Sequence, residues 1–178
     1  MSSFDQNNVI LIGMPGVGKS TFGVVLAKIL NYAFLDTDLL IQQETGRMLQ
    51  DIIDDDGVSG FIAIENETLK HLSCERTLIS TGGSAVYSGE GMDHLNQLGL
   101  IVYLKTTPEE LAAHLGDFAN RGVTSLKGGR PNLVELLEER EPLYEKYADV
   151  IVETQGLSIN AALDAILLAL KDAGIDRE

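Results

Sequence analysis

The 178-residue chain contains one cysteine and no tryptophan, and none of its apolar runs is long enough to span a membrane. Cys74 alone can form neither an internal disulfide nor a zinc site, so the fold needs no oxidising compartment. The first residues, MSSFDQNNVILIG, also lack the basic segment that precedes the apolar stretch of a secretory signal. We therefore expect a soluble, cytoplasmic protein with no membrane partner.

Basic residues are scarce as well. The chain has 13 Lys and Arg against 27 Asp and Glu, and its formal net charge is −14. Nucleic-acid-binding proteins neutralise phosphates with basic surface, so we expect no nucleic-acid partner. Four of the basic residues nevertheless fall within one short stretch, namely Arg121, Lys127, Arg130 and Arg140. In so acidic a chain, this cluster calls for a functional explanation.

Five apolar segments have the length and composition of strands, and helical patterns separate most of them. This order predicts an α/β fold of three layers, α/β/α, with a five-stranded parallel sheet in a single domain spanning residues 1–178. We expect a turn at DDDGVSG, residues 54–60, and a helix kink or boundary at Pro142. Residues 116–130 have four glycines and no regular apolar period, which predicts a mobile loop.

The most specific motif is GMPGVGKST, residues 13–21, which satisfies the phosphate-loop pattern G-x-x-x-x-G-K-[ST]. An apolar strand precedes it and a helical pattern follows, as this motif requires. Its glycines let backbone N–H groups turn toward phosphates, its lysine reaches the outer phosphates and its hydroxyl binds magnesium. The residues that we expect to bind the nucleotide are Gly13, Gly16, Val17, Gly18, Lys19, Ser20 and Thr21.

The phosphate loop alone does not distinguish a switch, a motor and a kinase. A guanine-nucleotide switch carries an N-K-x-D motif, which we do not find, and DDDG is better explained as a surface turn. A motor ATPase has an acidic residue at the end of a buried strand, whereas the strand TLIST ends in hydroxyl residues. A small-molecule kinase remains.

A pair of acids supports this interpretation. In FLDTD, Asp36 and Asp38 stand at the carboxyl end of an expected strand, where open α/β sheets bind ligands. Strand alternation would place both on the same side or nearly so. One can orient magnesium and its waters while the other accepts a hydroxyl proton, as phosphoryl transfer requires. A solvated turn is the alternative.

The phosphate loop, FLDTD, STGGSAV, the arginine-containing loop and EREPLYEKYAD occur in this order over nearly the whole chain, and together they resemble the shikimate kinase family. The resemblance implies a phosphate-loop fold of the nucleoside-monophosphate-kinase type with a mobile lid at about residues 116–130. It also implies transfer of the γ-phosphate of ATP to the 3-hydroxyl of shikimate with Mg²⁺, in aromatic amino acid biosynthesis. We expect a monomer whose partner is this small-molecule substrate.

The resemblance also implies roles for single residues. Lys19 and Ser20 match the phosphate and magnesium contacts, and Asp36 matches a magnesium ligand that acts through water. Asp38 matches the residue that binds and deprotonates the acceptor hydroxyl. The expected catalytic residues are therefore Asp38, Lys19 and Arg121, the last from the lid that closes over ATP. The expected substrate contacts are Asp38, Gly82, Gly83 and Arg140, the last binding the carboxylate.

The basic cluster also has a simpler explanation. Arg121 and Lys127 could belong to a solvated loop, and Arg140 could lie on an exposed helix face beside its neighbouring glutamates.

The chain departs from the family pattern at three places. In GFIAIE, Phe61 and Glu65 match the pattern F-R-x-x-E, but Ile62 replaces a second carboxylate-binding arginine. An isoleucine donates no hydrogen bond, which removes a contact worth roughly 1.5 to 3 kcal/mol. Ser84 replaces the third glycine of the usual G-G-G, and His114 stands where an adenine-side arginine is frequent.

Three interpretations of Ile62 are open. The protein could be a shikimate kinase in which Arg140 holds the carboxylate, with or without help from Arg47 or Arg130. It could be a kinase of the same fold that acts on a less acidic polyol. It could also be a non-catalytic regulatory protein that binds ATP. The intact phosphate loop, both aspartates and Arg140 would be superfluous without phosphoryl transfer, which favours the first interpretation.

Overall fold

The computed structural model describes residues 7–115, 125 and 132–176. Its five strands form one sheet, in the order β2-β3-β1-β4-β5, and every adjacent pair is parallel. The strands are β1 (Asn8–Ile12), β2 (Ala33–Asp36), β3 (Thr77–Ser80), β4 (Gly99–Lys105) and β5 (Val150–Glu153). The expected five-stranded parallel sheet is thereby confirmed.

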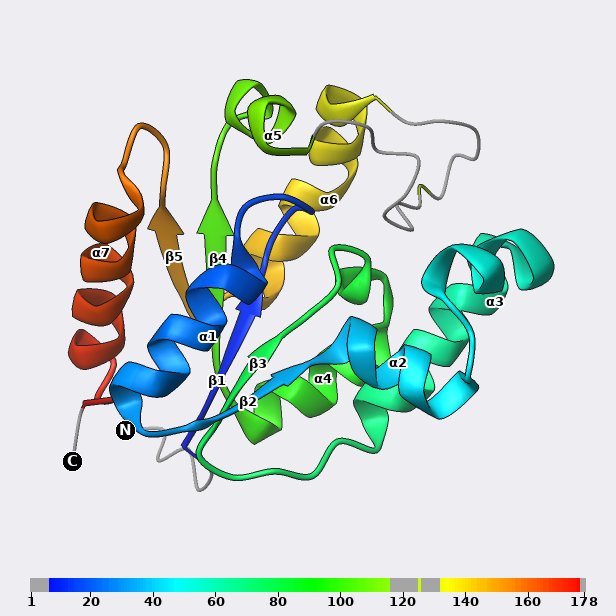
Figure 1. Cartoon of the computed structure of the whole chain (residues 1–178), viewed down its shortest axis with the longest axis horizontal. Helices are drawn as coiled ribbons and strands as arrows, with labels where there is room; N and C mark the ends of the chain where they lie inside the picture. The colour runs from blue at the N-terminus through cyan, green and yellow to red at the C-terminus, as the bar shows by residue number, and fades with distance from the viewer. Residues whose placement is uncertain (1–6, 116–124, 126–131, 177–178) are drawn as a thin grey trace.

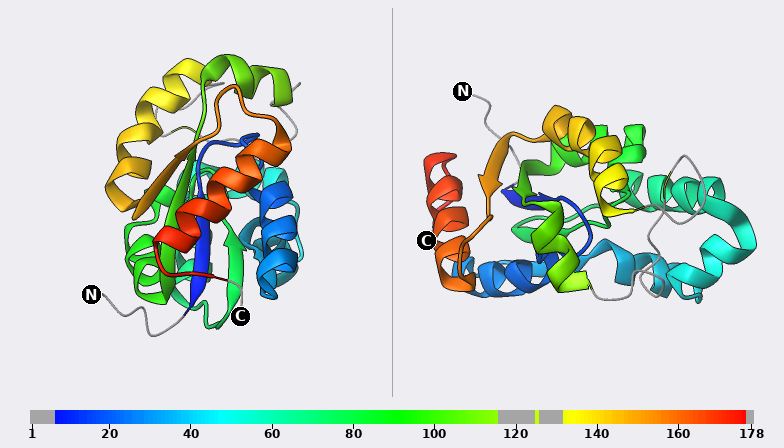
Figure 2. Two further views of the ribbon diagram at one scale, coloured as in Figure 1. Left: turned by 90° about the vertical axis from the view of Figure 1, so that its left-hand side faces the viewer. Right: turned by 90° about the horizontal axis from the view of Figure 1, so that it is seen from above.

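Helices cover both faces of this sheet. They are α1 (Lys19–Leu30), α2 (Thr37–Thr45), α3 (Leu49–Lys70), the 3₁₀ turn η1 (Ala85–Tyr87), α4 (Gly89–Leu98), α5 (Pro108–Leu115), α6 (Leu133–Tyr147) and α7 (Ile159–Asp172). Helices α1 and α7 lie on one face and α4 and α6 on the other, while α2 and α3 extend beyond the β2 end (Figures 1 and 2). The three-layer arrangement matches the sequence prediction.

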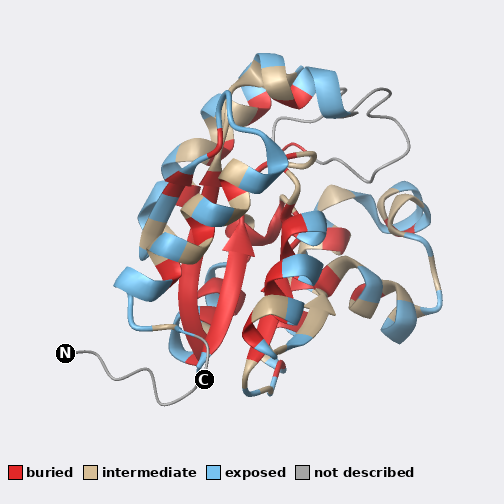
Figure 3. Ribbon diagram, turned by 60° about the vertical axis from the view of Figure 1, so that its left-hand side comes forward, coloured by how far each residue is buried: buried red, intermediate tan, exposed pale blue. Residues whose placement is uncertain are grey.

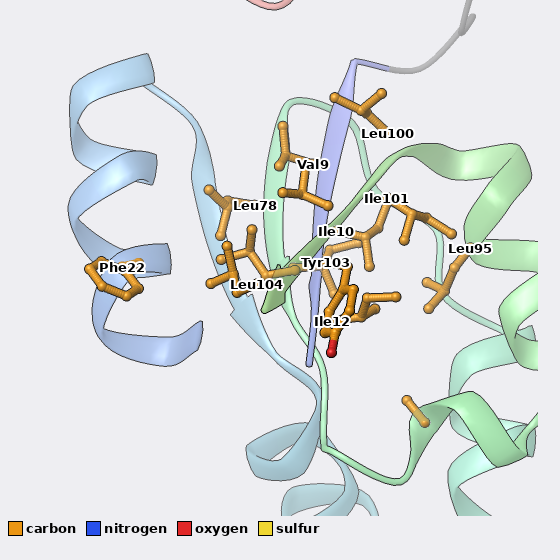
Figure 4. Packing of buried hydrophobic residues seen from close by; sticks show 14 of the residues in the cluster. Val9, Ile10, Ile12, Phe22, Leu78, Leu95, Leu100, Ile101, Tyr103 and Leu104 are labelled. Carbon is orange, nitrogen blue, oxygen red and sulfur yellow. The ribbon is translucent and has the colours of Figure 1, made fainter. Parts of the chain in front are cut away.

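The central strands lie in the middle of the hydrophobic core. All five residues of β1 are buried, which explains its continuous apolar run, because a parallel strand between two helical layers has no solvent-facing side (Figure 3). Phe22 of α1 packs on one side of the strands and Leu95 of α4 on the other (Figure 4). This core holds the carboxyl edge of the sheet in place, and the phosphate loop starts at that edge.

Two local expectations need correction. The expected turn at residues 54–60 is a kink inside α3, where Gly57 adopts φ 74° and ψ 175°. At Pro142 the expected boundary is absent, because α6 continues through this residue to Tyr147. Burial of Leu136, Arg140 and Tyr144 on one side of α6 stabilises the helix on both sides of the proline.

The expected lid at about residues 116–130 lies outside the described residues, apart from Ser125. Arg121, Lys127 and Arg130 therefore have no described position. Within residues 7–115 and 132–176, no helix combines the length and the apolarity that a membrane span requires.

Candidate active site

The phosphate loop connects β1 to α1 at the carboxyl edge of the sheet (Figure 1). Its glycines take backbone angles that other residues rarely adopt, with φ of 144° at Gly13, 84° at Gly16 and 103° at Gly18. Gly18 is the N-cap of α1 and contributes no side-chain cap, so the amides of the first turn are available to a ligand. The loop thus has the backbone form of an anion site at a helix N-terminus.

Lys19 is buried and directed back into this loop. Its Nζ donates to the carbonyl oxygens of Gly13 at 2.7 Å and of Met14 at 2.9 Å. Burial lowers the pKa of Lys19 to about 8, an effect that the negative charge of Asp38 partly opposes. A phosphate chain in the loop would restore the preference for the charged amine.

Ser20 and Asp36 form the oxygen pair that the sequence assigns to magnesium. The Ser20 hydroxyl donates to Asp36 Oδ2 at 2.7 Å. The other oxygen, Asp36 Oδ1, caps α2 by accepting from the amides of Asp38 at 3.0 Å and Leu39 at 3.3 Å. Magnesium in enzymes takes one or two protein oxygens, several waters and substrate phosphates, so this hydroxyl–carboxylate pair fits Mg²⁺.

The two aspartates do not alternate along one strand as the sequence suggested. Strand β2 ends at Asp36, and Asp38 lies in the first turn of α2. They still meet at the same edge, because Asp36 is at once the last strand residue and the helix cap.

Asp38 and Glu65 lie next to each other beside Gly82. A Cβ on Gly82 would lie 2.6 Å from Asp38 Oδ1 and 2.9 Å from Glu65 Oε1, closer than any side chain tolerates. Burial, followed by the charge of Asp36, raises the pKa of Asp38 to about 6. Burial and the charge of Asp38 raise the pKa of the fully buried Glu65 to about 8. This pair therefore carries close to one negative charge near neutral pH.

Ser84, which replaces a glycine of the family pattern, holds Glu65. Its hydroxyl donates to Glu65 Oε2 at 2.8 Å. Among the described residues, neither Asp38 Oδ1 nor Glu65 Oε1 has a hydrogen-bond partner, although both atoms are buried. A buried carboxyl oxygen without a protein partner is suited to a polar ligand, and of these two residues Asp38 lines the adjoining cavity.

Arg140 of α6 lies on the other side of the Gly82–Gly83 turn. It is 1% exposed, so the alternative of an exposed helix face is wrong. A Cβ on Gly83 would lie 2.7 Å from Arg140 Nη1, so only glycine allows the guanidinium to come this close. The turn thus has a carboxylate pair at its first glycine and a guanidinium at its second.

Two tyrosines surround Arg140. Arg140 Nε donates to the Tyr87 hydroxyl at 3.1 Å, and the guanidinium carbon lies 5.2 Å from the centre of the Tyr87 ring. Tyr144 donates to the carbonyl of Gly83 at 2.6 Å. Tyr87 is not among the predicted site residues, and no local sequence pattern marks it, because only the packing of η1 on α6 brings it to Arg140.

One cavity of about 660 Å³ connects these groups, a volume typical of small-molecule sites. It extends from the phosphate loop, where His114 and Ile159 also line it, to Asp38, Gly82, Gly83 and Arg140. All predicted site residues with a described position therefore meet at one edge of the sheet. Phe61 and Ser84 line the cavity as well, whereas the half-buried Ile62 is not among its lining residues.

Comparison with known proteins places the chain in a family. The family model described as shikimate kinase matches residues 15–171. A shikimate kinase from Vibrio parahaemolyticus is 35% identical over 94% of this chain and 98% of its own length. Solved shikimate kinases from Acinetobacter baumannii, in complex with shikimate, and from Aquifex aeolicus superpose with TM-scores of 0.83 and 0.79. They are 32% and 31% identical, over 94% of this chain in both cases and 95% and 98% of theirs. The chain belongs to the shikimate kinase family.

Proposed function

We propose that this protein is a kinase that transfers the γ-phosphate of ATP to the 3-hydroxyl of shikimate. The observation that carries the proposal is the cavity in which a phosphate loop, the carboxyl group of Asp38 and the buried Arg140 meet. A solved relative that superposes over most of the chain is a complex with shikimate, which supports the choice of acceptor.

In this proposal, the nucleotide lies over residues 13–21. Backbone amides of Gly13, Gly16, Val17 and Gly18, together with Lys19 and Thr21, would hold its phosphates. Lys19 would exchange its two carbonyl contacts for phosphate oxygens, and its charge would stabilise the transferred group. Arg121, outside the described residues, is proposed to add a second positive charge from the lid.

Ser20 and Asp36 would hold Mg²⁺, Ser20 directly and Asp36 through water. When bound, the ion supplies charge neutralisation for the phosphates. The two oxygens, Ser20 Oγ and Asp36 Oδ2, are 2.7 Å apart, so both are close enough to take part in binding the same ion.

At the acceptor end, Asp38 would take the proton of the 3-hydroxyl as that oxygen forms its bond to the γ-phosphorus and the bond to the ADP oxygen breaks. A pKa of about 6 leaves Asp38 mostly ionised at pH 7 and makes it a better proton acceptor than an ordinary carboxylate. Backbone groups of Gly82 and Gly83 would contact the sugar-like ring. Arg140 would bind the carboxylate with charge-assisted hydrogen bonds.

A kinase of the same fold that takes a less acidic polyol is the second candidate, because Ile62 occupies the place of a second arginine. The burial of Arg140 opposes this candidate, since a buried guanidinium favours an anionic ligand. We also propose that the protein acts as a cytoplasmic monomer.

The test measures ADP release with ATP and Mg²⁺ over a panel of acceptors, each against a blank without acceptor. Shikimate should give the highest kcat/KM, and neutral polyols of similar size should give much less. A neutral polyol that exceeds shikimate would support the second candidate. Asp38→Asn should reduce kcat at least a hundredfold and leave ATP binding within about twofold of wild type. Unchanged turnover in this variant would remove Asp38 from the mechanism.

A further inference from the structure

Thr37 lies between the two aspartates of the site and is itself fully buried. Asp36 ends β2 and Asp38 lies in the first turn of α2, while Thr37, the first residue of that helix, is 0% exposed. The Thr37 hydroxyl accepts a hydrogen bond from the backbone amide of Gly82 at 3.2 Å. Thr37 therefore connects the segment that carries both carboxylates to the turn at which the acceptor is proposed to bind.

This contact extends the attachment of β2 to β3 beyond the end of the sheet. The pairing of the two strands ends at Asp36 and Ser80, and Gly82 lies two residues further along the chain. Toward β1, the amide and the hydroxyl of Thr81 both donate to the Leu11 carbonyl, at 3.2 and 2.9 Å. The acceptor turn is thus fixed between β1, which leads into the phosphate loop, and the junction of β2 with α2.

The surroundings of the Gly82 amide explain why this hydroxyl matters. A buried backbone N–H without a partner is costly, so the amide would otherwise turn toward another acceptor. The polar atoms closest to the Cβ position of Gly82 are Asp38 Oδ1, at 2.6 Å, and Glu65 Oε1, at 2.9 Å. By accepting from the amide, Thr37 leaves the carboxyl oxygen of Asp38 to the acceptor hydroxyl.

We propose that Thr37 is a positioning residue for phosphoryl transfer: its hydroxyl holds the Gly82 turn at the distance from Asp38 and from the phosphate loop that the reaction requires. The inference rests on the proposed function, because it requires an acceptor bound at this turn. An acceptor displaced by about an ångström from the base and the phosphorus reacts far more slowly, so the effect should appear mainly in kcat. An uncharged hydroxyl also avoids a third negative charge beside the two aspartates.

The test compares Thr37→Val, which replaces the hydroxyl by a methyl group of similar size, with Thr37→Ser, which keeps the hydroxyl. For Thr37→Val we expect kcat with shikimate to fall at least tenfold, with the KM for ATP within twofold of wild type. Thr37→Ser should keep kcat within about threefold of wild type, because its hydroxyl can still accept from the Gly82 amide.

The matched control is Thr77→Val, at the opposite end of β3 from the turn. Thr77 is buried, its hydroxyl donates to the Glu75 carbonyl at 3.0 Å, and it is not among the residues that line the cavity. The same exchange at this position should change kcat and the KM for ATP less than twofold.

Three kinetic results would overturn the proposal. The first is a kcat of Thr37→Val within twofold of wild type. The second is an equal loss in Thr37→Val and Thr37→Ser, because the effect would then come from the size of the side chain. The third is a rise in the KM for ATP as large as the fall in kcat, since the change would then extend beyond the acceptor turn.

A second measurement detects the contact without turnover, and its wild-type result stands even if Thr37→Val does not fold. The Gly82 amide resonance, assigned by its loss in Gly82→Ala, should exchange slowly with water in wild type and in Thr37→Ser, and much faster in Thr37→Val. Fast exchange in wild type, or equally slow exchange in Thr37→Val, would overturn the contact even if shikimate is phosphorylated. The expected pattern in a protein that does not phosphorylate shikimate would contradict the proposed function instead, and the positioning role with it.

Discussion

The carboxyl groups of Asp38 and Glu65 lie on the same side of Gly82, within 2.6 and 2.9 Å of the point that a Cβ would occupy there. Asp38 comes from the first turn of α2 and Glu65 from the last third of α3, so two helices outside the sheet converge on one glycine. The absence of a side chain at Gly82 makes this convergence possible, and the proposed acceptor site depends on it.

Gly82→Ala should therefore disrupt the acceptor site. The added methyl group has to displace both carboxyl groups, and we expect kcat/KM for shikimate to fall at least tenfold while ATP affinity stays within twofold. Gly89→Ala at the start of α4 is the matched control, because a Cβ there meets no atom within 4 Å. The two variants are compared by steady-state kinetics and by nucleotide titration. Wild-type kinetics in Gly82→Ala would show that the Asp38–Glu65 arrangement is not needed.

The activity should have an acidic limb set by Asp38. The pKa of this carboxyl is raised to about 6, mainly by burial, and the protonated form accepts no proton from the acceptor. Below that pH, kcat/KM for shikimate should fall about tenfold per pH unit, since this parameter reports groups of the free enzyme. A profile measured from pH 5 to 8 checks this. A flat profile down to pH 5 would contradict the role of Asp38 as the base.

Glu65 should make the fold less stable as the pH rises. Its folded pKa is raised from an ordinary 4.5 to about 8, so the folded chain retains a proton that the unfolded chain releases. The stabilisation by protonated Glu65 is complete below pH 4.5 and is lost as the pH rises through 8. Between pH 6 and 8, this effect should lower the free energy of unfolding of the wild type by up to about 1 kcal/mol per pH unit. Glu65→Gln should lack this contribution to the pH dependence.

Urea unfolding at pH 6, 7 and 8 measures this slope. Asp93→Asn on the exposed side of α4 serves as the control, because it removes a carboxyl group that is not buried. The control should retain the wild-type slope. A Glu65→Gln slope equal to that of wild type would mean that Glu65 is already ionised in this range.

Much of this architecture follows from local sequence patterns. The apolar runs predict the five parallel strands, and the phosphate-loop spacing predicts the positions of Lys19 and Ser20. The meeting of Asp38, Gly82 and Arg140 was expected from the family resemblance, not from spacing. The contacts of Ser84 with Glu65 and of Tyr87 with Arg140 join residues far apart in the sequence, and a single serine or tyrosine carries no periodic signal. The boundary expected at Pro142 is absent because burial on one face of α6 outweighs the local preference of proline.

Ile62→Arg tests the position at which the chain departs from its family. Ile62 is half-buried one residue after Phe61, which lines the cavity, so the variant asks whether a side chain at position 62 is directed toward the acceptor. A second guanidinium should lower the KM for shikimate roughly tenfold and leave the KM for methyl shikimate, in which the carboxylate is esterified, within about twofold. Ile62→Lys separates charge from geometry, since an ammonium forms no bidentate contact. An unchanged KM in a folded Ile62→Arg protein would mean that the side chain at 62 is directed away from the acceptor.

The identity of the phosphorylated product tests the central claim most directly. The protein is incubated with ATP, Mg²⁺ and shikimate, the product is examined by ³¹P and ¹H NMR, and ADP is quantified in the same sample. We predict one phosphate ester, on the 3-hydroxyl of shikimate, formed in equal amount to ADP and absent with Asp38→Asn. ADP without a shikimate phosphate ester, or no shikimate-dependent ADP from a protein that binds ATP, would contradict the account.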